Sequence, residues 1–193
     1  MALMTDTAPS DEALIQRYSR GDAAAFDELY ERHELRVWRY LERNVRNQAT
    51  ADDLLQEVWF AVARDAPRYE PSARFTAWLF AIAHHRLIDS IRSSRRQVSL
   101  DSLGYDSDSV REQLTADAAA GPLASALRRG EQGEVLRALA KLPPEQREAF
   151  LLQIEGDLSV EEIAAITRST FETVKSRLRY ARVKLRELLK EHA

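Results

Sequence analysis

The side chains in this sequence that could do chemistry are cations, and they recur on one side of a single predicted helix. The run STFETVKSRLRYARVKLRELLK covers residues 169–190. On a helical wheel of 100° per residue, its apolar side chains fall on one narrow arc: Val174, Leu178, Ala181, Leu185 and Leu188. Its cationic side chains fall on a second arc about 100° away: Lys175, Arg179, Arg182 and Arg186. Such a cationic face can bind the phosphates of a nucleic acid, and a solvated surface helix is the alternative.

No cluster of side chains favours catalysis. His84 and His85 are neighbours, so on a helix they point about 100° apart and cannot share a metal ion. His85 and Asp89 are four residues apart and offer two ligands at most, and such a pair is usually a surface pair. The chain has no cysteine, no glycine-rich phosphate loop and no nucleophile elbow. We therefore expect no enzyme activity, no catalytic residues, no metal site, no cofactor and no small-molecule substrate.

The charge of the chain is unevenly distributed. The net charge of -3 over 193 residues would by itself argue against a nucleic-acid partner. Residues 168–190, however, hold eight Lys or Arg against two Glu, and residues 84–96 hold four Arg against one Asp. Between them, residues 101–117 hold five acidic residues against one Arg. Two basic segments are therefore separated by an acidic one.

Nothing in the sequence points to a membrane or to export. The longest apolar run, AWLFAIA at residues 77–83, is far too short to span a bilayer. The chain does not open on a basic segment followed by an apolar one and a small-residue cleavage site. We expect a cytoplasmic protein without membrane insertion, and the absence of cysteine fits a reducing compartment.

The hydrophobic pattern predicts helices almost throughout. Apolar residues recur every three or four positions through residues 11–19 and 23–43, and RGD at residues 20–22 is the predicted break. Thr50 and Asp53 match a capping box, which predicts the start of the next helix. The segment after that helix contains two prolines and is predicted to be a loop.

A longer helix is predicted from Phe75 to Arg96, and it has two apolar arcs. One arc holds Phe75, Trp78, Leu79 and Ile82, and the roughly opposite arc holds Phe80, Leu87, Ile88 and Ile91. A helix of this kind packs on both sides, as an inner member of a bundle does. A polar stripe between the arcs should be exposed and mostly basic: His85, Asp89, Arg92 and Arg96.

The composition divides the chain into two small domains. Residues 97–121 are rich in Ser, Asp, Ala and Gly without sustained periodicity, so we predict a flexible acidic linker there. The helical signal returns from Pro122 onward. We therefore expect an all-α fold with a helical bundle over residues 1–96 and a second helical domain over residues 122–193.

The most specific pattern lies in LSVEEIAAITRSTFETVKSRLRYA, residues 158–181. Ser159 with Glu162 and Ser169 with Glu172 each match a capping box, and a turn of about four residues joins the two helices that they begin. The residues expected to face each other across a steep helix crossing are Ile163, Ala164, Ile166, Val174 and Leu178. This pattern predicts a helix-turn-helix, whose second helix reads base edges in the major groove of DNA.

Several motifs in a fixed order resemble one bacterial family. DELYERHELRVWRYL, ADDLLQEVWFAVAR and FTAWLFAIAHHRLIDSIRSSRR are similar to the promoter-melting domain of the extracytoplasmic-function group of the sigma-70 family. LAKLPPEQREAFLLQIEGDLSVEEIAAITRSTFETVKSRLRYARVKLREL is similar to the C-terminal domain of that group. The resemblance covers about residues 11–96 and 131–189. It implies a sigma factor that binds core RNA polymerase and directs promoter recognition, strand opening and transcription initiation at a specific regulon.

The resemblance implies three sets of site residues. Duplex DNA of the minus-35 element would meet Thr170, Phe171, Glu172, Lys175, Ser176, Arg179 and Tyr180, with Arg177 and Arg182 on phosphates. The non-template strand of the minus-10 element would meet Tyr69, Arg74, His85, Arg86, Arg92, Arg95 and Arg96. The polymerase would meet Asp52, Asp53, Gln56 and Glu57.

Structural alternatives stand beside these roles. Phe75 and Trp78 share an apolar arc with Leu79 and are expected in the core rather than on bases. The acidic residues at the predicted start of the third helix also suit a solvated helix terminus, where the helix dipole favours negative charge.

The sequence departs from the family at two positions. His85 stands where the family commonly has Asn, and Arg168 stands where the turn commonly has Gly. We expect the first to alter base preference and the second to alter the shape of the turn. The resemblance also implies an anti-sigma factor as a partner.

A DNA-binding response regulator or repressor with a similar C-terminal domain is the competing interpretation. Sensor domains of such proteins are commonly α/β, and the first half of this chain shows no alternating strand pattern. A repressor should bind duplex DNA alone as a dimer, whereas a sigma factor should co-purify with polymerase.

Overall fold

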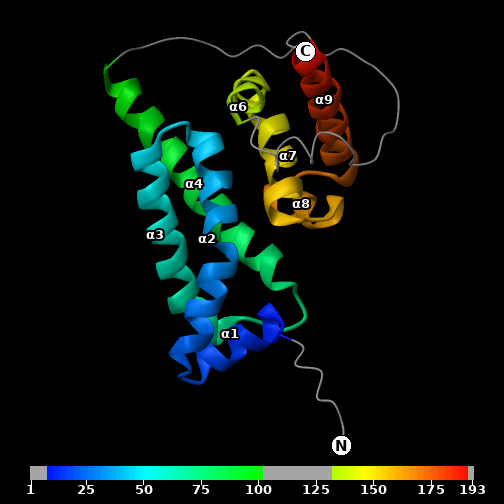
Figure 1. The fold of residues 1–193 in the computed structure, drawn as a ribbon. Helices are drawn as coiled ribbons and strands as arrows, with labels where there is room; N and C mark the ends of the chain where they lie inside the picture. The colour runs from blue at the N-terminus through cyan, green and yellow to red at the C-terminus, as the bar shows by residue number, and fades with distance from the viewer. Residues whose placement is uncertain (1–7, 102–131, 191–193) are drawn as a thin grey trace, which may run out of the picture.

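The computed structural model describes residues 8–101 and 132–190, and every regular element within them is helical (Figure 1). The N-terminal unit consists of α1 (Asp11–Ser19), α2 (Ala23–Val45), α3 (Gln48–Asp65), the 3-10 helix η1 (Ala66–Arg68) and α4 (Phe75–Asp101). The C-terminal unit consists of α6 (Gln132–Ala140), α7 (Pro144–Gly156), α8 (Val160–Thr167) and α9 (Phe171–Lys190). The prediction of an all-α fold is confirmed.

The break predicted at residues 20–22 is present between α1 and α2. The Ser10 side chain caps α1 by accepting a hydrogen bond from the Ala13 amide at 3.2 Å. Gly21 has φ +100°, a conformation that L side chains rarely adopt, and so it lets the chain reverse direction.

The predicted cap of α3 at Thr50 is wrong by three residues, because Asn47 caps the helix. Arg46 ends α2 in the left-handed conformation with φ 56°, and Asn47 is extended immediately after it. The Asn47 carboxamide oxygen therefore accepts from the Thr50 amide at 2.9 Å and becomes the cap. The helix begins at Gln48, and Thr50 lies within its first turn.

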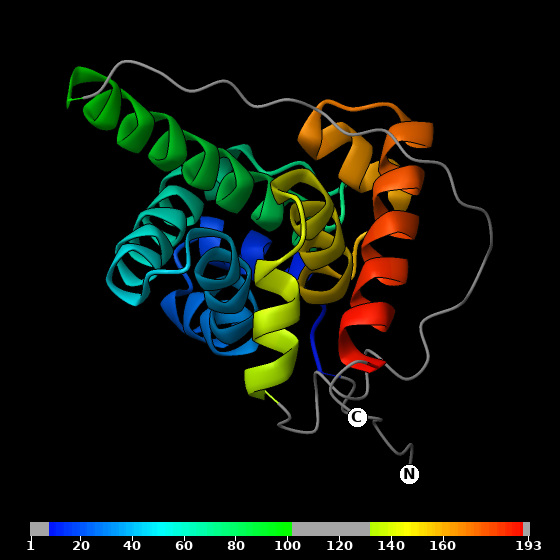
Figure 2. The same ribbon diagram turned by 90° about the horizontal axis from the view of Figure 1, so that it is seen from above.

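Helix α4 is packed on two sides, as its two apolar arcs predict. Phe75, Leu79, Phe80, Ala83 and Leu87 are fully or almost fully buried. Helices α2 and α3 cover one side of α4, and α7 and α8 approach it from the other (Figure 2). Its far end projects beyond the rest of the N-terminal unit (Figure 1).

The predicted boundary at residue 96 falls inside α4, which continues to Asp101. No Gly or Pro interrupts the sequence between Arg96 and Gly104, so nothing in it stops the helix at the predicted point. The rest of the predicted linker, and the helical signal from Pro122 to residue 131, lie outside the described residues.

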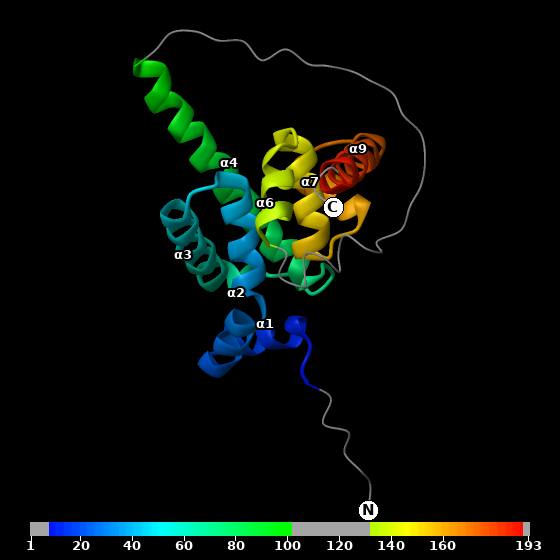
Figure 3. The same ribbon diagram turned by 45° about the horizontal axis from the view of Figure 1, so that its top comes forward.

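The two units pack directly against each other. Helix α2 contacts α7 and α6, and α4 contacts α8 and α7 (Figure 3). Buried apolar side chains lie at the centre of this contact: a Cβ at Gly156 would come within 2.8 Å of Leu158 Cγ and 3.3 Å of Phe80 Cγ. The Tyr40 and Phe80 rings make an edge contact beside it, with centroids 5.6 Å apart. The sequence pattern, which indicates only two domains and a linker, does not predict this contact.

Candidate nucleic-acid interface

Helices α8 and α9 form the predicted helix-turn-helix. The Ser159 side chain accepts from the Glu162 amide at 3.2 Å, and the Glu162 carboxylate accepts from the Ser159 amide at 2.8 Å. This reciprocal pair is the predicted capping box. Ile163, Val174 and Leu178 are buried where the two helices meet, so the predicted contact face is confirmed.

Arg168 performs the backbone role expected of a glycine in the turn. It ends α8 in the left-handed conformation with φ 51°, and its amide donates to carbonyl oxygens of α8. An Arg in this conformation carries a strain that Gly would not, while its side chain remains exposed. Arg168 thus supplies the left-handed backbone conformation that Gly would adopt easily, and it adds a cation to the turn.

The predicted cap of α9 at Ser169 is wrong, because Thr170 caps the helix instead. Thr170 Oγ1 accepts from the Thr173 amide at 3.1 Å. Ser169 Oγ lies one residue too early for that bond, and it accepts from Arg177 Nη1 at 3.0 Å. This hydrogen bond links the turn to the cationic side of α9.

The start of α9 is open to solvent. Thr170, Phe171, Glu172 and Lys175 are exposed, and Phe171 is one of the few large apolar side chains with a high exposed fraction, 42%. Val174 and Leu178 on the opposite side are buried. A rigid helix thus presents an exposed edge of mixed polar, aromatic and cationic side chains, which is suited to the edges of base pairs.

The remaining predicted minus-35 residues are half-buried on the same helix: Ser176, Arg177, Arg179, Tyr180 and Arg182. Arg182 Nη2 donates to Gln153 Oε1 of α7 at 2.6 Å, which fixes the guanidinium. The Arg179 guanidinium carbon lies 5.2 Å from the centre of the Tyr180 ring, a cation–π arrangement. These bonds hold the cationic side chains along one face of α9.

Tyr69, which is predicted to bind the minus-10 strand, is far less accessible than the start of α9. Tyr69 is only 8% exposed, and its ring makes edge contacts with Phe75 and Trp78. Its hydroxyl donates to the Ala73 carbonyl, and burial raises its pKa to about 12. Tyr69 therefore shapes the loop in this arrangement, and its ring is not free to stack on a base. Phe75 is fully buried, as expected of a core residue.

Arg74 is held by the C-terminal unit. Its Nη1 donates to the Asp157 carbonyl at 3.1 Å and to Glu162 Oε2 at 3.2 Å. Its Nη2 lies 3.6 Å from Asp157 Oδ2. The side chain is half exposed, so these ion pairs are weak individually.

Glu12 was not predicted, yet it determines how α4 begins. Its Oε1 accepts from the Phe75 amide at 3.0 Å, and this hydrogen bond lowers the pKa of the Glu12 carboxyl. An unpaired amide at a helix start requires such an acceptor. Since 63 residues separate the pair in sequence, no local pattern could have indicated it.

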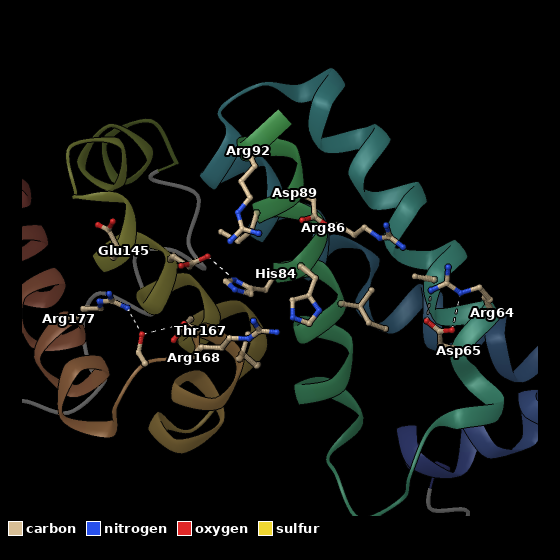
Figure 4. A pocket seen from close by; sticks show the side chains of 17 residues that line it. Arg64, Asp65, His84, Arg86, Asp89, Arg92, Glu145, Thr167, Arg168 and Arg177 are labelled. Carbon is tan, nitrogen blue, oxygen red and sulfur yellow. Dashed lines mark hydrogen bonds and ion pairs between the residues drawn. The ribbon is translucent and has the colours of Figure 1, made fainter. Parts of the chain in front are cut away.

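The predicted strand-binding residues along α4 border a cleft of about 630 Å³ between the two units (Figure 4). His85 and Arg92 are exposed and Arg86 is half-buried. Across the cleft lies the turn of the helix-turn-helix with Arg168. Burial, together with the positive charge of His84 and Arg168, lowers the pKa of His85. Arg95 and Arg96 lie in α4, but their side chains are outside the described set.

His84 differs from its neighbour His85. It is buried, and its Nδ1 lies 2.9 Å from Glu148 Oε1 of α7. No group of three or more His, Cys, Asp or Glu in residues 8–101 and 132–190 is arranged to hold a metal ion.

The acidic face predicted on α3 is present but smaller than expected. Asp53, Gln56 and Glu57 are exposed on one side of the helix. Asp52 is half-buried, and its Oδ1 accepts from Trp38 Nε1 at 2.6 Å, so it is engaged within the bundle. Phe60, 73% exposed, extends the face by one turn and was missed. Phe60 follows Glu57 by three residues and Gln56 by four, and this spacing indicates that the three side chains share one face of the helix.

Comparisons with known proteins agree with this architecture. Two family models match the chain: Sigma-70 region 2 over residues 29–97 and Sigma-70, region 4 over residues 132–185. The RNA polymerase sigma factor CarQ of Myxococcus xanthus is 37% identical over 179 residues, which cover 92% of this chain and 96% of CarQ. The ECF RNA polymerase sigma factor SigE of Mycolicibacterium smegmatis is 36% identical over 183 residues, covering 90% of this chain and 66% of SigE.

A solved structure shares the fold. The sigma factor RpoE from Bartonella quintana, in its co-crystal structure with the anti-sigma factor NepR, matches with a TM-score of 0.66 at 24% identity. The match covers 86% of this chain and 96% of RpoE.

The helical units and the sequence matches define the class: this chain belongs to the sigma-70 family of RNA polymerase sigma factors. Within that family it is a member of the extracytoplasmic-function (ECF) group, as its motifs predict. None of the described helices is long and apolar enough to cross a membrane.

Proposed function

We propose that this chain binds core RNA polymerase and directs it to promoters, with one unit reading the minus-35 element as duplex and the other holding the minus-10 element as a single strand. The protein acts by binding, and the polymerase carries out the synthesis. The observation that carries this proposal is the exposed start of α9 on a capped helix-turn-helix.

Two kinds of contact would divide the work on α9. Lys175 and the residues at the start of the helix would contact base edges, since they are exposed where a recognition helix enters the major groove. Arg177 and Arg182 are braced by Ser169 and Gln153 and would contact phosphates.

The exposed side of α3 would dock on the polymerase. Asp53 and Glu57 suit a basic partner surface, and Phe60 beside them offers an apolar anchor of the kind that concentrates binding energy in interfaces. Asp52 would contribute chiefly by orienting Trp38. An anti-sigma factor is a further proposed partner, supported by the likeness to RpoE in complex with NepR.

Transcription in vitro with core polymerase and a promoter library tests the function. The wild-type chain should select a set of promoters that core polymerase alone does not transcribe. Asp53→Arg with Glu57→Arg should abolish both co-elution with core polymerase and transcription while leaving the helical content unchanged. Asp27→Arg with Glu31→Arg, on the exposed surface of α2, is the matched control. Normal co-elution of the α3 variant would contradict the assignment of that face.

A further inference from the structure

Four carboxylates of the C-terminal unit lie against the N-terminal unit along one edge of α7 and α8. We call them the acidic ridge: Glu148, Glu155, Asp157 and Glu162. Asp157, Glu155 and Glu162 each pair with an arginine across the contact, and Glu148 pairs with the imidazole of His84. The contact between the units is therefore complementary in charge as well as in shape.

The outer members of the ridge engage the side of the N-terminal unit that is proposed to hold single-stranded DNA. Arg74, at the end of the predicted strand-binding loop, pairs with Asp157 and Glu162. His84, adjacent to His85 on α4, pairs with Glu148. A carboxylate offers an arginine the same anionic oxygen acceptors as a phosphate. The ridge thus occupies Arg74, a cation that the proposed minus-10 strand would otherwise bind.

The centre of the ridge is buried. Arg43 and Glu155 form a hydrogen-bonded ion pair with only 9% and 7% of their side-chain surfaces exposed, and Arg39 lies 3.8 Å from the same carboxylate. Burial lowers the pKa of Arg43 and raises the pKa of Glu155, so burial disfavours the charged form of each. A buried ion pair of this kind fixes the register of a contact more than it strengthens it. The buried pair therefore specifies how the two units align.

Simultaneous reading of both promoter elements requires the two units to separate. The names of the elements place their centres about 25 base pairs apart, on the order of 80 Å of B-form DNA at about 3.4 Å per base pair. A compact chain of 193 residues has a radius of gyration of only about 16 Å. Residues 102–131 can span up to about 100 Å when extended, so the covalent connection permits separation.

We propose that the acidic ridge is an internal mimic of the promoter strand: in the free chain it docks on the strand-binding side of the N-terminal unit, and single-stranded DNA competes with it for Arg74 and the start of α4. This inference rests on the proposed function. It adds a competing occupant, the chain's own α7 and α8, for the surface that the minus-10 strand would use.

Charge-neutral substitutions on the ridge test the competition. The double variant Glu148→Gln with Glu162→Gln loses the His84–Glu148 and Arg74–Glu162 pairs. The new amide oxygen at residue 162 can still accept from the Ser159 amide, so the cap of α8 is preserved. The matched control is Glu145→Gln with Glu161→Gln. These two residues lie on the same helices, are exposed, and have no ion-pair partner among the described residues. Both double variants change the net charge equally.

The readouts are strand affinity and the distance between the units. The probe is a fluorescein-labelled single-stranded oligonucleotide of mixed sequence and about 12 nucleotides. The distance is followed by energy transfer between dyes on cysteines introduced at the exposed positions Glu31 and Glu187, since the chain has no cysteine of its own. We expect the ridge variant to bind about three- to tenfold more tightly than the wild type with reduced energy transfer, and the control to change by less than about twofold.

Equal strand affinities of the ridge variant and its control would overturn the internal mimic. That result would leave the proposed function standing if the wild-type chain still directs transcription from promoters. Loss of promoter-directed transcription by the wild-type chain would instead overturn the function and the inference that rests on it.

Discussion

The two proposed nucleic-acid readers of this chain, the start of α9 for duplex DNA and the start of α4 for a single strand, differ in how much of each is covered. The start of α9 is exposed, and the bonds made by its cations stay within the C-terminal unit. The start of α4 is surrounded: Glu12 caps it from α1, and Arg74 pairs with α7–α8 residues from the other unit. The proposed duplex reader is therefore accessible in the described arrangement, whereas the proposed strand reader is partly covered by the C-terminal unit.

Under the proposed function, this difference means that the C-terminal unit of the chain partly covers the single-strand site of the N-terminal unit, with no further protein required. Duplex DNA is always available, while a single strand appears only after the duplex opens. The arrangement suits this order: the proposed duplex reader is accessible from the start, and the proposed strand reader is needed only after the duplex has opened.

The largest effect should come from breaking the buried ion pair. Arg43→Ala leaves the Glu155 carboxylate buried without its closest partner, which costs about 3–5 kcal/mol in comparable sites. We expect the two units to separate while each remains folded. Hydrogen exchange should show faster exchange in α7 and near Phe80, with α9 protection unchanged.

The matched control for that variant replaces both partners by apolar residues. Arg43→Met with Glu155→Leu should keep the units docked, because no unpaired charge remains buried. Separation in this double variant as well would show that the ion pair itself, rather than the avoidance of a buried charge, holds the units together.

The next effect should fall on the duplex reader alone. Lys175→Ala and Arg179→Ala should each weaken binding of minus-35 duplex by about 1–3 kcal/mol where the contact is to a base edge, and less where it is to phosphate. Competition binding with duplex fragments recovered from the transcribed promoters measures this. Lys184→Ala, an exposed cation farther along α9, is the control. Unchanged binding and transcription in both variants would remove α9 from the reader.

A smaller effect should fall on the strand reader alone. Glu12→Ala removes the acceptor for the Phe75 amide and should destabilise the start of α4 by about 0.5–2 kcal/mol, as loss of other helix caps does. Glu12→Gln keeps an acceptor oxygen and should behave nearly as wild type. Amide exchange at Phe75 distinguishes them. Equal exchange in Glu12→Ala and wild type would show that the cap is dispensable.

The smallest predicted effect is a pH dependence of the N-terminal unit. The hydrogen bond from Phe75 holds the pKa of Glu12 below its ordinary value of 4.5. A carboxyl with a lowered folded-state pKa stabilises the fold above its unfolded pKa, and this stabilisation is lost as the pH falls through the folded-state pKa. Thermal unfolding between about pH 5 and pH 3 should therefore show a shallower pH dependence in Glu12→Gln than in wild type. Parallel curves would contradict this role of Glu12.

Local features of the fold were predictable from the sequence, since helical periodicity and helix caps depend on residues that are close together in the chain. The buried arc of α9 and the Ser159 capping box followed directly from spacing. The caps at Asn47 and Thr170 did not, because several side chains nearby could serve and the left-handed residue before each cap decides which one does. Arg46 and Arg168 adopt that conformation although neither is Gly.

The contact between the units lay beyond any such pattern. Arg43 and Glu155 are 112 residues apart, and each taken alone resembles an ordinary surface charge. The cationic arc of α9 followed from helical spacing, and the other site residues predicted on α9 and α3 came from the family resemblance. The cover over Arg74 depends on tertiary packing instead. Site residues on one helix face are therefore visible in a sequence, and their occupation by another part of the chain is not.

The distance between the two units in the free chain and in the promoter complex tests this account most directly. Spin or dye labels at cysteines replacing Glu31 and Glu187 report on it in a chain otherwise free of cysteine. We predict one short distance in the free chain and a much longer one once core polymerase and promoter DNA are bound. A transcriptionally active complex that keeps the short distance would contradict the claim that the readers must separate.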